Sequence, residues 1–100
     1  MIIYNVTINV DDESHLQWLT WMQKEHIPAV LSTGLFTGYR ICRLLEVDDE
    51  GSTYSIQYSL NGLAEYNEYR EKHAPRLQKE VLDKFKDKFT AFRTLLEVVE

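Results

Sequence analysis

The chain repeats itself, because a strand-like segment that closes its first half returns in similar form near its end. Residues 36–47 read FTGYRICRLLEV and residues 89–98 read FTAFRTLLEV. A His-x-Pro sequence stands upstream of each copy, at residues 26–28 and 73–75. Short apolar strands can resemble each other by chance. The alternative is two similar β-α-β units related by a pseudo-two-fold axis, which predicts the order β-α-β-β-α-β.

Four segments predict β-strands, at residues 2–10, 36–47, 53–60 and 89–99. The first and third alternate between apolar and polar residues, as a strand with one buried face does. Their predicted buried residues are Tyr4, Val6, Ile8, Tyr54, Ile56 and Tyr58, and their other face carries Ile3, Asn5, Thr7, Ser55 and Gln57. A turn at residues 48–52, with Gly51 at a positive φ, makes the second and third strands a hairpin.

Two helical segments separate these strands. Residues 11–14 are expected to cap the first helix and to give it an acidic first turn. This helix runs to about His26 and is broken or kinked at Pro28, whereas the second begins at residue 61 or 62 and is interrupted by Pro75. Helical spacing predicts two buried stripes: Leu16, Leu19, Met22, His26, Ile27 and Val30, and then Leu63, Tyr66, Tyr69, His73, Ala74, Leu77 and Val81.

Right-handed crossovers place both helices on one face of a four-stranded antiparallel sheet. The opposite face stays bare, and its side chains are polar but carry little charge. Two such sheets packed face to face would enclose a moist cavity, so we expect a homodimer. Trp21 lies opposite the buried stripe of its helix, where it either anchors an interface or covers its own neighbours.

Composition limits what the chain can do. One hundred residues fit a single domain, residues 1–100. A single cysteine excludes an internal disulfide and favours a reducing compartment, so we expect the cytoplasm. The net charge of −5 argues against nucleic acid. No leader, no membrane span, no phosphate loop and no cofactor motif is recognised, and three scattered histidines make a weak metal site.

Several segments together resemble a known family. They are residues 18–22, 26–31 and 33–36, followed by residues 73–77 and the ending at residues 92–98. Over essentially the whole chain they are similar to small bacterial proteins catalogued only as a domain of unknown function. The resemblance implies a ferredoxin-like α+β sandwich that forms a dimeric α/β barrel, and it brings no assigned activity.

The wider barrel superfamily includes cofactor-independent monooxygenases, haem-degrading enzymes, isomerases and ligand-sensing modules. Some haem-degrading members use an Asn on the first strand, a Trp, and a His on the second helix. The resemblance places Asn5 and His73 in comparable positions. The second helix carries Tyr66 and Tyr69 and no Trp, which departs from that pattern.

His26 and His73 are the candidate catalytic residues, because imidazole moves protons near neutral pH. Each could instead bond a free carbonyl at a broken helix end. Arg40 and Arg93 hold matching places in the repeat and, on the bare face, would grip a carboxylate or phosphate. A salt bridge is the alternative for both.

Asn5 and Gln57 complete the candidate ligand-binding set, and a solvated sheet face is their alternative. Three functions follow. The first is a homodimeric module that binds a small, anionic molecule. The second is a cofactor-independent monooxygenase or isomerase with a His general base. The third is a structural or protein-interaction domain without a ligand.

Overall fold

The computed structural model describes residues 1–47 and 50–100. The elements, in chain order, are β1 (Ile2–Val10), α1 (His15–Trp21), η1 (Met22–His26), α2 (Ile27–Leu31), β2 (Gly38–Arg43), β3 (Ser52–Leu60), α3 (Leu63–Lys72), α4 (Ala74–Lys84) and β4 (Phe89–Glu97). Asp48 and Asp49 of the predicted turn lie outside the described residues. None of the helices in the described part of the chain has the length and hydropathy needed to span a membrane.

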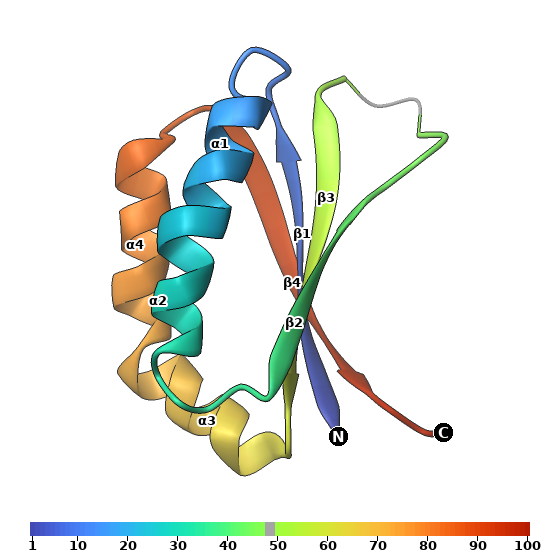
Figure 1. Cartoon of the computed structure of the whole chain (residues 1–100), viewed down its shortest axis with the longest axis vertical. Helices are drawn as coiled ribbons and strands as arrows, with labels where there is room; N and C mark the ends of the chain where they lie inside the picture. Colours follow the sequence, from blue (N-terminus) through green and yellow to red (C-terminus); the bar gives the residue numbers. More distant parts are fainter. Residues whose placement is uncertain (48–49) are drawn as a thin grey trace.

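The four strands form one antiparallel sheet in the order β2-β3-β1-β4. All helices lie on one side of it, and the other side is uncovered (Figure 1). The predicted order and layering are therefore confirmed. The two repeated segments are the outer strands β2 and β4, on either side of the central pair β1 and β3.

The register of the central strands explains the core. Tyr4 pairs with Tyr58, Val6 with Ile56, and Ile8 with Tyr54, so that these side chains share the covered face. All six are buried, as the alternation predicts. We call this side the covered face and the opposite side the open face.

The first helical segment is buried differently from the prediction. Leu16 is 68% exposed, whereas Trp18 is 0% exposed. The cause is η1, a π-helical turn in which the Ile27 N–H bonds to the Met22 carbonyl. A π turn holds one more residue than an α turn, so it rotates the preceding turns by roughly 100° relative to those that follow. That rotation brings Trp18 inward and carries Leu16 out.

The predicted start of this helix is confirmed in position, with the N-cap at Ser14, but its predicted acidic first turn is wrong. Ser14 takes the N-cap position without a side-chain hydrogen bond, and the first turn contains no acidic residue. Asp12 instead accepts a hydrogen bond from Ser52 Oγ at 3.1 Å. The acidic stretch therefore ties the start of the helix to β3 rather than capping it.

The second helical segment is divided at His73, whose φ of −125° separates α3 from α4. Pro75 stands in the first turn of α4, where its missing N–H costs nothing. The predicted stripe is buried at Tyr69, Ala74, Leu77 and Val81, but Leu63 is exposed.

Both outer strands are shorter than predicted. β2 ends at Arg43, and one further backbone bond joins the Leu44 N–H to the Thr53 carbonyl. The chain reaches a left-handed conformation at Glu46, with φ 56°. Gly51 has φ +82°, and a Cβ there would lie 2.6 Å from the Val10 carbonyl oxygen. The expected need for glycine at this turn is confirmed.

Candidate functional site

A pocket lies between the covered face of the sheet and the helices. The space between its lining atoms is about 430 Å³ including the mouth, and about 30 Å³ of it admits the centre of a water molecule. That is room for roughly two waters. The lining residues are Tyr4, Val6, Ile8, Met22, His26, Ile56, Tyr58, Tyr69, Gln78, Val81, Phe89, Ala91 and Arg93. We call it the inner cavity.

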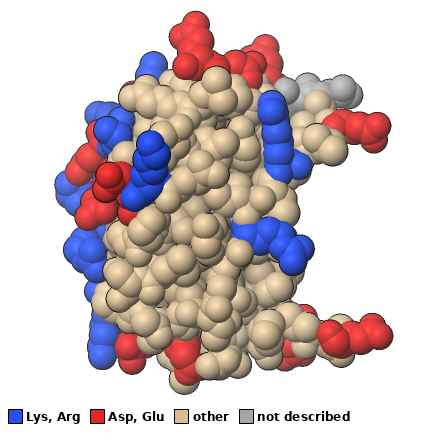
Figure 2. Space-filling model, viewed as in Figure 1, with Lys and Arg blue, Asp and Glu red and all other residues tan. Residues whose placement is uncertain are grey.

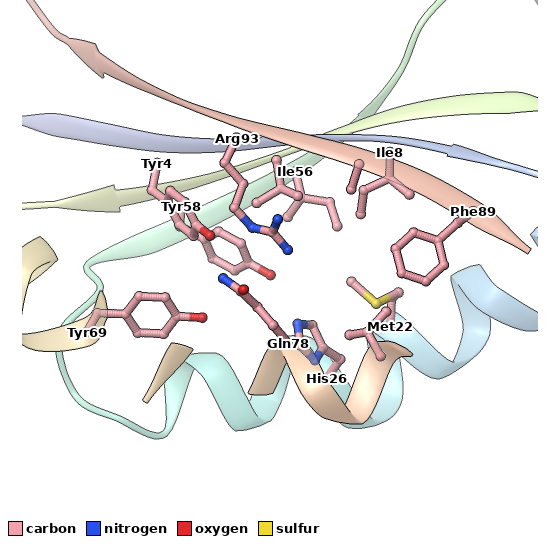
Figure 3. A pocket seen from close by; sticks show the side chains of 13 residues that line it. Tyr4, Ile8, Met22, His26, Ile56, Tyr58, Tyr69, Gln78, Phe89 and Arg93 are labelled. Atoms are coloured by element: carbon pink, nitrogen blue, oxygen red, sulfur yellow. The ribbon is translucent and has the colours of Figure 1, made fainter. Parts of the chain in front are cut away.

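Polar side chains from six elements enter this otherwise apolar cavity. The sheet contributes Tyr4 from β1, Tyr58 from β3 and Arg93 from β4. The helix layer contributes His26, Tyr69 and Gln78. In Figure 3, Arg93 points from β4 toward Gln78 and His26, while Ile8, Met22 and Phe89 form an apolar end. The cavity therefore has a polar part and an apolar part.

His26 ends the π turn, and this turn aims its imidazole at the sheet. The residue is 9% exposed, and Nδ1 is buried with no hydrogen-bond partner among the described residues. Trp21 stacks on the ring at 5.5 Å, with 24° between the planes. Burial first, and the positive charge of Arg93 second, together lower the pKa of His26 to about 4. The imidazole is therefore neutral at physiological pH.

The tyrosine hydroxyls remain protonated in the inner cavity. Burial raises the pKa of Tyr4, Tyr58 and Tyr69 above the usual value of tyrosine. For Tyr4, the charge and hydrogen bonding of Arg93 oppose this rise in pKa, as does a hydrogen bond from Gln78. The hydroxyls are thus available as hydrogen-bond donors.

Arg93 brings a positive charge to this site. None of the residues that line the inner cavity is Asp or Glu. The ion pairs in residues 1–47 and 50–100 join Lys72 to Glu68 and Lys79 to Asp83, and both are exposed. The guanidinium therefore has no carboxylate counter-ion within the described part of the chain.

The structure separates the residues that the sequence analysis grouped together. His26 and Arg93 line the inner cavity, so the expectation that Arg93 lies on the open face is wrong: Arg93 pairs with Val6, whose side chain is covered. Arg40 pairs with Gln57 and shares the open face with it. The two arginines of the repeat thus lie on opposite faces.

His73 lies outside the inner cavity, at the break between α3 and α4. Its ring stacks on Tyr69 at 6.4 Å, and Nδ1 is 3.4 Å from Nη2 of Arg76. These contacts are those of a residue at a helix junction. A catalytic role for His73 stays a prediction, and it would have to act away from the inner cavity.

The open face holds a polar network. Ser55 Oγ donates to Asn5 Oδ1 at 2.6 Å, and Asn5 Nδ2 donates to Thr7 Oγ1 at 3.1 Å and to Thr94 Oγ1 at 3.2 Å. Gln57 Nε2 lies 3.5 Å from Ser55 Oγ. A groove on this face is lined by Thr7, Asn9, Leu44, Glu50, Thr53, Thr90 and Phe92. In Figure 2, the surface is hollowed on the side away from the helices.

Four polar residues of the cavity were not proposed as site residues from the sequence: Tyr4, Tyr58, Tyr69 and Gln78. The tyrosines were assigned to the core from their spacing, and the signal that could have found them is their hydroxyl group. A buried tyrosine needs a polar neighbour, and three of them predict a polar pocket. Within the described residues, no group of three or more His, Cys, Asp or Glu is placed to hold a metal ion.

The similarity to known proteins covers nearly the whole chain. A family model described as a domain of unknown function (DUF4286) matches residues 1–99. No curated protein matches the sequence. A dimeric ferredoxin-like protein from an uncultured marine organism is similar in structure, with a TM-score of 0.72 and 13% identity, over 99% of this chain and 94% of that one.

Two further solved structures are similar. One is a MhuD variant with two manganese protoporphyrin IX bound per active site, with a TM-score of 0.69 and 16% identity, over 100% of this chain and 96% of that one. The other is a variant of SnoaB, a cofactor-independent oxygenase from Streptomyces nogalater. It matches with a TM-score of 0.67 and 10% identity, over 99% of this chain and 94% of that one. At these identities the likeness establishes the ferredoxin-like α+β fold alone.

Proposed function

The chain belongs to the family described as a domain of unknown function (DUF4286), and we propose that it is a homodimeric module that binds a small anionic molecule in its inner cavity. The observation that carries this proposal is the guanidinium of Arg93, which enters a cavity that has no acidic lining residue. Arginine donates hydrogen bonds and accepts none, so its natural partner is an oxyanion.

The other polar groups of the cavity suit the same ligand. Tyrosine hydroxyls and the Gln78 amide donate hydrogen bonds, and the apolar end formed by Met22 and Phe89 excludes water. A few convergent polar groups in an apolar pocket are typical of small-molecule sites. An anion held there would supply the negative charge that Arg93 lacks.

The homodimer is supported by the open face. Phe92 is 61% exposed there, and Leu44 and Leu96 are also exposed. Isolated exposed apolar residues are ordinary, but a group of them around a hollow fits an interface. The similar ferredoxin-like protein named above is dimeric. In this proposal Asn5, Arg40 and Gln57 face the second subunit, where they bind a ligand or the partner.

Thermal shift with nitrate, formate and acetate tests the binding proposal, with acetamide as the neutral control. An anion at 100 times its dissociation constant adds about 2.7 kcal/mol to stability. Arg93→Gln should remove this gain. Arg40→Gln, which changes the matching arginine on the other face, should keep it. Loss of the gain in both variants, or stabilisation by acetamide, would contradict the inner cavity as the site.

His26 supports a second candidate function, an isomerase or cofactor-independent monooxygenase in which this neutral imidazole accepts a proton. The observation in its favour is the buried Nδ1, which has no hydrogen-bond partner among the described residues, in a cavity that also holds a cation to stabilise a developing anion. Turnover of enolisable or phenolic compounds should then disappear in His26→Gln while the fold survives. Turnover that persists in this variant excludes His26 as the base.

A further inference from the structure

We propose that the inner cavity takes up its anion together with one proton, which His26 accepts on the ring nitrogen that carries none. This inference rests on the proposed function, because it adds a proton to the binding of the anion. It follows from three features of the site as formed by residues 1–47 and 50–100: a buried imidazole with an unpartnered nitrogen, a guanidinium without a counter-ion, and a lining without carboxylates.

Among the described residues, the groups that surround His26 in the inner cavity carry no negative charge. Arg93 approaches from β4, and the neutral hydroxyls of Tyr4, Tyr58 and Tyr69 approach from β1, β3 and α3, beside the Gln78 amide of α4. Trp21 covers the ring on the α1 side. Lys24 and Glu25 of its own turn are exposed, and they line an outer groove with Lys84. His26 thus faces one cation and several neutral groups.

An anion in this space changes the electrostatics of the imidazole. Without the anion, burial disfavours the charged imidazolium, and the positive charge of Arg93 adds to this effect, so the pKa of His26 is held at about 4. With the anion bound, the imidazolium gains an opposite charge and a hydrogen-bond acceptor. Both effects raise its pKa. Anion binding and protonation of His26 therefore favour each other.

The size of the cavity limits the anion. Space for roughly two waters fits a compact planar oxyanion, either a free one such as nitrate or formate or the carboxylate head of a larger molecule. β4 is an outer strand, and Arg93 is exposed even though its side chain reaches inward. A larger molecule would leave the cavity past this residue, at the edge of the sheet.

The proton has a measurable consequence. Nitrate stays an anion at every pH used, so any pH dependence of its affinity belongs to the protein. Its affinity should rise as the pH falls from 8 to 5, by at most tenfold per pH unit for one proton. Below pH 4 it should level off, because His26 is then protonated without the ligand.

Isothermal titration with nitrate at pH 8, 7, 6 and 5 measures this dependence in the unmodified protein and in His26→Gln and His73→Gln. The unmodified protein and His73→Gln should bind more tightly at low pH, whereas His26→Gln should bind with an affinity that does not change with pH. The imidazole resonances of His26, recorded with and without nitrate at pH 6, report protonation directly and need no variant to fold.

The outcomes separate the two proposals. Nitrate binding that requires Arg93 but does not vary with pH overturns proton uptake and leaves the anion site standing. If the imidazole resonances of His26 do not change at saturating nitrate, proton uptake is likewise overturned and the anion site still stands. If neither nitrate, formate nor acetate binds, the proposed function fails and the inference fails with it.

Discussion

The two faces of the sheet are made by the same strands and have opposite chemistry. On β3, Ile56 is 1% exposed and packs under the helices, while its neighbour Gln57 lies on the open face. The covered face surrounds the inner cavity with aromatic and aliphatic groups and one cation. The open face carries hydrogen-bonded Asn5 and Ser55 beside exposed Phe92. In the proposed function, the covered face takes the small ligand and the open face meets a second sheet.

The repeated outer strands show that similar sequences do not guarantee similar orientation. Phe89 and Arg93 point to the covered face and Phe92 to the open face, because β4 pairs continuously with β1 from Val10 onward. In the other copy Phe36 contacts Tyr58, but regular pairing starts only at Gly38. This irregular start shifts the alternation of side chains by one residue. Because successive side chains of a strand point to opposite faces, every later residue of this copy lies on the face opposite to its counterpart in β4.

Adjacent substitutions on β3 give the largest expected contrast between the faces. Ile56→Ala should lower the free energy of unfolding by about 2–5 kcal/mol, because it removes buried methyl groups and leaves a cavity. Gln57→Ala should change it by about 0.5 kcal/mol or less. Urea denaturation of both variants measures the difference. Equal losses would mean that both faces are buried in the subunit.

Acid should destabilise the covered face through His26. The unfolded chain binds a proton near pH 6.5, but the folded chain binds it only near pH 4, where the pKa of His26 lies. The contribution of neutral His26 to the free energy of unfolding is thus fully present above pH 6.5. It is lost as the pH falls to 4, and the loss amounts to roughly 3 kcal/mol. Urea denaturation between pH 7.5 and 4 should show a smaller loss in His26→Gln than in His73→Gln. The same loss in both variants would assign it to other groups.

A polar substitution on the open face should weaken self-association. Phe92→Ser removes an exposed ring from the proposed interface, and we expect the dissociation constant of the dimer to rise about tenfold, equivalent to about 1.4 kcal/mol. Sedimentation equilibrium measures it. Leu82→Ser, at another exposed apolar residue on α4, should leave it unchanged. A monomer in the unmodified protein would rule out the dimer.

A moderate effect is expected in the open-face network. Ser55→Ala removes the 2.6 Å hydrogen bond to Asn5 Oδ1 and should cost about 1 kcal/mol of unfolding free energy. Thermal denaturation of the variant is the measurement. A loss as large as that of Ile56→Ala would show that the network supports the core rather than a wet surface.

Much of this arrangement could be predicted from the sequence. The alternation in β1 and β3 identified the covered residues, because a strand has a fixed two-residue period. The face on which Arg93 lies could not be predicted, because residues 89–98 do not alternate between apolar and polar residues. Which of their side chains point to the covered face is set by the pairing with β1. Trp18 was missed because a π turn depends on packing and leaves no clear pattern in a single sequence. Gln78 was missed because it neighbours a buried stripe and belongs to no motif.

The π turn at Met22–His26 makes the length of this helix as important as its composition. Deleting one residue there would restore ordinary α-helical hydrogen bonding, which local energetics favour. The same deletion would turn Trp18 outward and detach His26 from the register that aims it at Arg93. Among related sequences, a one-residue deletion at this turn would therefore mark members that keep the fold and lose the imidazole from the cavity.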